Sequence, residues 1–225
     1  MNRRILLAPF TGLFGLLALS GTAVSETYET AADVTNDSVF ATYLAGQAQM
    51  QYRAILALQE DNKAGILCEG EQTISPSALR ILSPVTISED DERPTAGRWI
   101  ERYDVTVCDR TRTYNAIFSV EPDGNMNARP ATPGTSSRNF DLLRDLRPFM
   151  EQSAQLGDCE SRAVYDTKTG LPDGYNPEVA DGSYDTWTVV GCGEAVDMVL
   201  RFAPAEDGNV SVSVETQIFN PIEIN

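Results

Sequence analysis

The sequence predicts an α+β fold made of two tandem units, each with a helix packed on a small antiparallel sheet and one disulfide inside the unit. Three observations support this prediction. The same strand–cysteine–strand pattern occurs twice, an amphipathic helical stretch precedes each copy, and each copy holds two of the four cysteines. The predicted boundaries are a signal peptide at 1–25, a first unit at 26–128, a connector at 129–138 and a second unit at 139–225.

The two copies align without a gap when they are matched on one cysteine of each. The aligned pairs are Tyr103 with Trp187, Val105 with Val189, Cys108 with Cys192 and Phe118 with Phe202. The turn sequence Asp-Gly-Asn then recurs at the same distance after each cysteine, at 123–125 and at 207–209. We interpret the pattern as an internal duplication, so matched residues are expected to have the same structural role.

The first 25 residues have the anatomy of a secretory signal peptide. Arg3 and Arg4 precede an apolar run at 5–19, and small residues at 23–25 precede the expected cut. The mature chain is therefore expected to start at Glu26 and to be periplasmic or secreted. An uncleaved anchor is the alternative, although this apolar run is short for a bilayer span.

Charge limits the possible partners. The chain has 33 acidic and 17 basic residues, no histidine and a formal charge of -16, which becomes -18 when the signal peptide and its two arginines are removed. Such a protein is repelled by nucleic acid and by anionic lipid. The expected partner is an unknown protein of the cell envelope, with no nucleic acid and no membrane-spanning segment after signal cleavage.

The four cysteines of an exported chain predict two disulfides, for which three pairings exist. The duplication selects pairing inside each unit, Cys68 with Cys108 and Cys159 with Cys192. A zinc site is the alternative, but the chain has neither a closely spaced cysteine pair nor a histidine.

Two helices are predicted from apolar residues at helical spacing. The first runs from a cap at 36–38 to about residue 60, and its buried face is predicted to hold Phe40, Tyr43, Leu44, Ala48, Ala54, Ile55 and Leu58. Its exposed face is predicted to hold Thr42, Gln49, Arg53 and Glu60. The second begins near Phe140, and Pro148 is expected to kink or split it. A short helix is predicted at 75–82, and the acidic stretch at 89–92 is predicted to be a solvated hairpin tip, with a metal role as the alternative.

Alternating apolar residues predict the strands. In the first unit, strands are predicted from Trp99 to Val107 and from Tyr114 to Val120, joined by a turn at 109–113, with a third strand after the Asp-Gly turn. In the second unit they are predicted at 186–192, 197–202 and 210–218. The predicted core residues are Trp99, Tyr103, Phe118, Trp187 and Phe202.

The stretch from Trp187 to Gly193, in which a tryptophan strand runs into a Cys-Gly pair, resembles a group of secreted proteobacterial proteins. The segment Pro133-Gly134-Thr135 adds to the resemblance, which covers roughly 64–215. It implies an exported domain and brings no known activity and no functional residues. The first unit departs from the pattern, because Asp109 stands where the second has Gly193.

The chain lacks the residues of most common active sites. Without histidine it has no Ser-His-Asp or Cys-His arrangement, and it has neither a Ser-x-x-Lys motif nor a glycine-rich phosphate loop. Carboxylates remain, and the densest group is Asp173, Asn176, Glu178, Asp181 and Asp185. This loop is a candidate for calcium, with a solvated acidic loop as the alternative. Glu178 and Asp185 are the candidate pair for a glycosidase.

The sequence alone therefore assigns no catalytic, cofactor-binding or metal residues and implies no cofactor. The leading hypothesis is a non-enzymatic exported interaction or structural module. The alternatives are a carboxylate-dependent hydrolase such as a glycosidase and a calcium-stabilised envelope component. Two converging acids in a deep cleft would favour the enzyme, whereas an exposed apolar patch or sheet edge would favour the binding module.

Overall fold

The computed structural model is a mostly β protein. Strands make up 47% and helices 23% of the residues that it describes. The residues it describes are 17–19, 38–88, 90, 92–178, 181–205 and 210–220. The predicted α+β fold of tandem helix-on-sheet units is therefore wrong. Most of the predicted signal peptide and the second Asp-Gly-Asn turn, at 207–209, lie outside the described residues.

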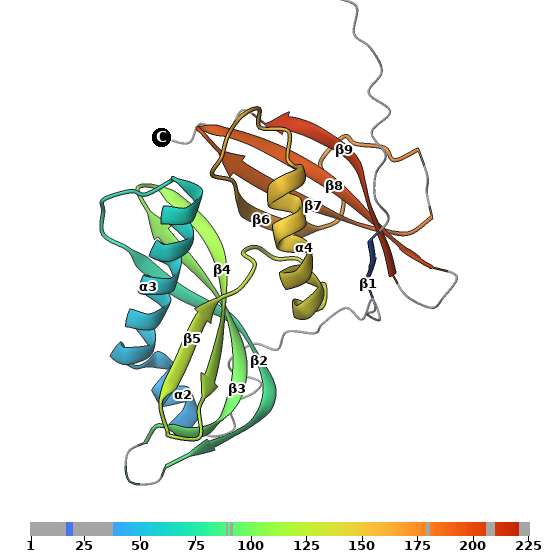
Figure 1. The fold of residues 1–225 in the computed structure, drawn as a ribbon. Coiled ribbons are helices and arrows are strands. Elements are labelled where there is room, and N and C mark those ends of the chain that lie inside the picture. Colours follow the sequence, from blue (N-terminus) through green and yellow to red (C-terminus); the bar gives the residue numbers. More distant parts are fainter. Residues whose placement is uncertain are drawn as a thin grey trace, which may run out of the picture.

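Two antiparallel sheets form the body of the molecule (Figure 1). The first sheet has the order β2-β3-β4-β5, with β2 at Thr73–Ile87, β3 at Pro94–Val107, β4 at Arg110–Val120 and β5 at Met126–Pro130. The second has the order β9-β8-β7-β6, with β6 at Ala163–Thr169, β7 at Ser183–Gly191, β8 at Glu194–Pro204 and β9 at Val210–Asn220. A three-residue strand, β1 (Leu17–Leu19), pairs with β9 at the edge of the second sheet.

Three helices lie against these sheets in the described part of the chain. They are α2 (Ser38–Ala45), α3 (Gln47–Ala64) and α4 (Phe140–Ser153). Gly46 separates α2 from α3, and α3 ends at Gly65, whose left-handed φ of 68° favours glycine. The side chain of Asn139 caps α4 by accepting a hydrogen bond from the Asp141 amide at 2.8 Å. Pro148 lies inside α4, which continues to Ser153, so the predicted split does not occur.

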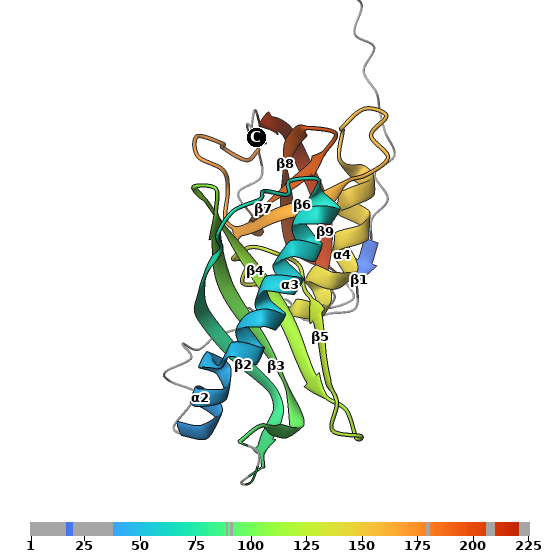
Figure 2. The same cartoon turned by 90° about the vertical axis from the view of Figure 1, so that its left-hand side faces the viewer.

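Helix α3 belongs to both sheets, which is why the chain does not divide into two helix-on-sheet units. Leu56 and Ala57 pack in the core of the first sheet with Trp99. Further along, Ala64 packs with Val190 and other apolar residues of the second sheet. In Figure 2 the helix runs from the first sheet up to the second.

The buried face of α3 is not the predicted one. Ile55 and Leu58 are 53% and 48% exposed, whereas Gln49, Arg53 and Glu60, which were predicted to be exposed, are buried. These polar side chains are buried because each has a partner across the interface. Gln49 and Arg53 donate hydrogen bonds to Glu101 on β3 at 2.6 and 2.7 Å, and Glu60 accepts one from Arg147 on α4 at 2.5 Å.

The predicted short helix at 75–82 is also wrong, because these residues belong to β2. Proline is tolerated in a strand at an edge or at a bulge. β2 is an edge strand, and its pairing register with β3 shifts directly after Pro76. The pair Ser75-Pro76 therefore did not distinguish the start of a helix from a strand with a bulge.

The two hairpins β3-β4 and β7-β8 have the same geometry. Each turns on two residues with positive φ, Cys108 and Asp109 in the first and Cys192 and Gly193 in the second. The first turn is thus shorter than the predicted 109–113. Each turn cysteine forms a disulfide, Cys68–Cys108 and Cys159–Cys192, which is the pairing predicted from the sequence.

The predicted core residues are all buried. Trp99, Tyr103, Phe118 and Trp187 are 0% exposed, and Phe202 is 2% exposed. Register explains the agreement between the two halves: Tyr103 pairs with Tyr114 four residues before β3 ends, and Trp187 pairs with Met198 four residues before β7 ends. The five core residues are therefore predicted correctly, although β7 is buried on both faces and shows no alternation of burial.

Candidate functional site

The acidic loop considered for calcium and for a glycosidase does not assemble a site. Asp185 lies in β7, 0% exposed, where it accepts hydrogen bonds from Ser136 at 2.6 Å and Arg138 at 2.9 Å. Burial raises the pKa of Asp185, and these two hydrogen bonds act in the opposite direction. Glu178 is exposed in the loop. Because Asp185 is committed to the interior, it does not join Glu178 at a sugar or a cation.

The other members of that loop, Asp173, Asn176 and Asp181, are exposed. Within the described residues, no group of three or more acidic or cysteine side chains is placed to hold a metal ion. In the described part of the chain, no helix is long and apolar enough to span a bilayer.

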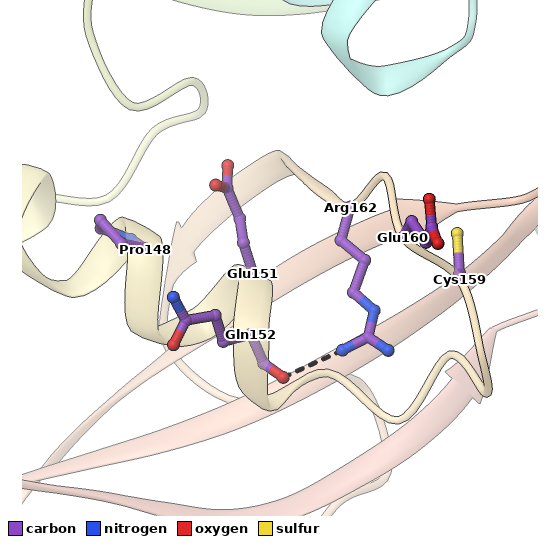
Figure 3. A pocket seen from close by; sticks show the side chains of 6 residues that line it. All are labelled: Pro148, Glu151, Gln152, Cys159, Glu160 and Arg162. Carbon is purple, nitrogen blue, oxygen red and sulfur yellow. Dashed lines mark hydrogen bonds between the residues drawn. The ribbon is translucent and has the colours of Figure 1, made fainter.

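A pocket of about 410 Å³ lies between the end of α4 and the loop that leads to β6 (Figure 3). Arg162 donates hydrogen bonds to the carbonyl oxygens of Gln152 at 2.9 Å and Gly157 at 2.8 Å, so it satisfies the C-terminal end of α4. Glu151 accepts from Lys63 on α3 at 2.7 Å and from Arg147 at 3.0 Å. These contacts attach α4 to α3 and to its own following loop, which is a structural role.

Glu151 leads to a prediction about acid stability. Burial acts to raise its pKa, but the hydrogen bonds and charges of Lys63 and Arg147 outweigh it and lower the pKa below 4.5. A carboxyl with a lowered folded-state pKa stabilises the protein above its unfolded pKa, and this stabilisation is lost as the pH falls through the folded value. We expect Glu151→Gln to lower the unfolding free energy by about 1–3 kcal/mol at pH 7 and by much less at pH 3.

Urea unfolding of the two proteins at both pH values measures this difference. The control is Glu160→Gln, an exposed acid that lines the same pocket. A Glu151→Gln deficit that is equally large at pH 3 and pH 7 would contradict the assignment.

A second groove, of about 350 Å³, lies on the outer face of the second sheet and includes Asp166, Lys168 and Asp197 in its lining. Lys168 pairs with Asp166 at 3.0 Å, and Thr188 donates a hydrogen bond to Asp197 at 2.6 Å. Both carboxylates therefore have partners in the protein. The groove offers hydrogen-bonding groups but no acid and base arranged around a reacting atom.

The sheet edges differ in how well they are protected against further pairing. β2 contains Pro76 and Pro84 and several register shifts, and β5 has only five residues and ends in Pro130. The connector covers β6, since the amides of Thr135 and Ser136 both donate hydrogen bonds to the Thr167 carbonyl oxygen. Prolines, short strands and covering segments are the usual means of blocking an edge.

β9 is less well protected, although its register with β8 shifts once, between Val199 and Leu200, and β1 covers one end of it. It is eleven residues long, contains no proline, lysine or arginine, and carries Glu215 as its single charge. On its outer side, within the described residues, only Val210–Val212 are paired, with β1. The far end of the strand presents exposed apolar side chains, with Ile218 38% and Phe219 63% exposed.

Alternating apolar residues at 210–218 predicted the β9 strand, but they did not indicate that it lies at a sheet edge. Val210 and Val212 are buried as expected and pack with the core of the second sheet. The signal that could have identified the edge is the order of the strands, because the last strand of a meander has a neighbour on one side only. No protein-family model, curated protein or solved structure matches this chain.

Proposed function

We propose that the protein is a non-enzymatic exported interaction module that binds an extended segment of a partner protein along the β9 edge. The observation that carries the proposal is the long, mostly unpaired outer side of β9. It has backbone donors and acceptors for strand addition, and it already pairs antiparallel with Leu17–Leu19. Main-chain hydrogen bonds would supply affinity, and exposed Phe219 would supply a side-chain contact.

The charge of the protein restricts the partner. The β9 edge carries one charge, the acid Glu215, in a chain of net charge -16, so the segment bound at this edge is expected to be neutral or basic, with apolar residues on alternate positions. Leu17–Leu19 lies in the expected signal peptide, so its removal would open the whole edge. The two disulfides are consistent with an oxidising, exported location.

The test uses the chain from Glu26 to Asn225 and a fluorescent peptide of residues 10–20 with two lysines added for solubility. In the register of β1 this peptide would extend along β9 from Val210 to Phe219. We expect the peptide to bind, and we expect Ile218→Ala combined with Phe219→Ala to weaken binding about tenfold. The matched control is Ile55→Ala combined with Leu58→Ala, which removes exposed apolar side chains on α3.

The main-chain part of the proposal has its own readout. A peptide with N-methyl groups on alternate residues lacks the backbone N–H donors along the edge that would face β9. This peptide should therefore not bind. Equal binding of the methylated and plain peptides, or an equal loss in the α3 control, would overturn strand addition at β9.

A further inference from the structure

The face of the first sheet that points away from α3 is rich in arginine. Directly paired residues on neighbouring strands share a face. Pairing across the four strands places Arg80, Ile100, Ile117 and Arg129 in one row and Ser83, Arg98, Ser119 and Asn127 in the next. Arg102 lies one row further on, paired with Asn115. Four of the 17 basic residues of this acidic chain therefore share one sheet face.

Part of this face is covered by the chain itself. Ile100 and Ile117 pack against Ala131 and Phe140. Arg102 is used internally, since it donates hydrogen bonds to the Asn115 side chain at 3.1 Å and to the Ser136 carbonyl oxygen at 3.2 Å. The connector thus closes one end of the face and leaves the row of Arg98 at the other end open.

Arg98 lies in the open row, and Arg129 lies on the edge strand β5 in the neighbouring row. Arg98 is partly exposed and Arg129 is exposed. Arg129 lines a small hollow with Arg144 and Arg147, but those two are paired with acids, Arg144 with Asp141 and Arg147 with Glu60. Within the described residues, neither Arg98 nor Arg129 forms a salt bridge. Ser119, the partner of Arg98 on β4, donates a hydrogen bond to Glu121 at 3.3 Å.

The spacing of these arginines is compatible with an extended acidic segment. Neighbouring strands are about 4.8 Å apart and alternate residues about 7 Å apart, so the backbones at Arg98 and Arg129 are separated by roughly 12 Å. Arginine side chains are long enough to bridge this separation. Carboxylates on alternate residues of an extended chain lie about 7 Å apart on one face, within reach of both side chains.

We infer that this face, between Arg80, Arg98 and Arg129, binds a short acidic segment of a partner polypeptide. Guanidinium groups bind carboxylates through paired hydrogen bonds. The net charge of -16 limits which anions can bind, because it repels a ligand in proportion to the ligand's total negative charge. A nucleic acid or another dense polyanion is therefore disfavoured relative to a peptide with a few carboxylates. This surface is separate from the β9 edge, and its test is independent of the proposed function.

The experiment measures binding of N-acetylated hexaglutamate to the full chain, with hexaserine as the neutral probe. We expect hexaglutamate to bind and hexaserine not to bind, and we expect added salt to weaken binding because it screens the charges. Arg98→Glu combined with Arg129→Glu should reduce hexaglutamate affinity at least about tenfold. Each single variant should show a smaller loss.

The matched control is Lys168→Glu, which makes the same charge change as one of those singles on the exposed outer face of the second sheet. Lys168→Glu should leave hexaglutamate affinity within about twofold of that of the unmodified protein, whereas Arg129→Glu should lower it further. Melting curves confirm that each variant is folded. No detectable hexaglutamate binding, an equal loss in Lys168→Glu, tighter binding of inorganic polyphosphate, or self-association that the double variant abolishes would each overturn the inference.

Discussion

Replacing Phe118 by alanine is expected to lower the free energy of unfolding by about 3–5 kcal/mol, the usual cost of removing a fully buried phenylalanine. Phe118 stacks on Trp99 with ring centroids 5.6 Å apart and meets the ring of Tyr52 edge-on at 6.3 Å. The cavity left by the ring would be enclosed by rigid aromatic neighbours, so little collapse is expected. Phe202→Ala should cost a similar amount, because Phe202 lies in the corresponding core of the second sheet.

Urea unfolding measures both losses. Phe219→Ala is the matched control, because Phe219 is 63% exposed and its removal should change stability by less than about 0.5 kcal/mol. A loss below about 1 kcal/mol at Phe118 would mean that the buried face of β4 is wrongly assigned.

The second large effect is expected at the buried charge pair beneath α3. Arg53→Ala should destabilise the protein by about 3–5 kcal/mol, since it leaves the Glu101 carboxylate buried without its cation. Glu101 is 3% exposed, and it accepts hydrogen bonds from Arg53 at 2.7 Å and from the Trp99 indole at 2.8 Å. Burial raises the pKa of Glu101, and the Arg53 charge and the hydrogen bonds oppose that rise.

A double variant separates the destabilisation caused by an unpaired buried charge from the contribution of the ion pair to the free energy of unfolding. Arg53→Met with Glu101→Leu removes both charges and should be much more stable than Arg53→Ala alone. Arg144→Ala serves as the control, because its ion pair with Asp141 is exposed and should contribute less than about 1 kcal/mol. Additive losses at Arg53 and Glu101 would show that the two side chains are not coupled.

Short-range patterns in the sequence predicted the hairpins and the core well. Alternation along β3 located the buried face, and the matched cysteines gave the disulfide pairing, because both signals depend on residues close to one another in the chain or at the same register. Helical periodicity failed for α3, where Gln49 and Arg53 are buried and Ile55 is exposed. Burial of those polar groups depends on Glu101, about fifty residues away, and periodicity carries no information about distant partners.

The fold class was wrong for a related reason. The division into two units followed the duplication, and it assigned each helix to its own sheet. Arg112 illustrates the missing information: it forms an ion pair with Asp61 on α3 and also donates a hydrogen bond to the carbonyl oxygen of Tyr165 on β6. Aligning the two sequence copies reveals features that they share, but it gives no information about contacts between the two halves. The β9 edge and the arginine face were missed as sites because both depend on strand order.

The sharing of α3 between the two sheets determines the order in which the chain can complete its fold. As the chain grows from its N-terminus, α3 and the first sheet are made before α4 and β6 exist. Until they arrive, Glu60 lacks Arg147 and the apolar surface of Ala64 and Ile66 has nothing to pack against. A nascent first half is therefore expected to have an unpaired Glu60 next to exposed apolar surface. Exposed apolar surface makes folding intermediates prone to aggregate. The first half is therefore expected to reach its native packing only after the second half has been made.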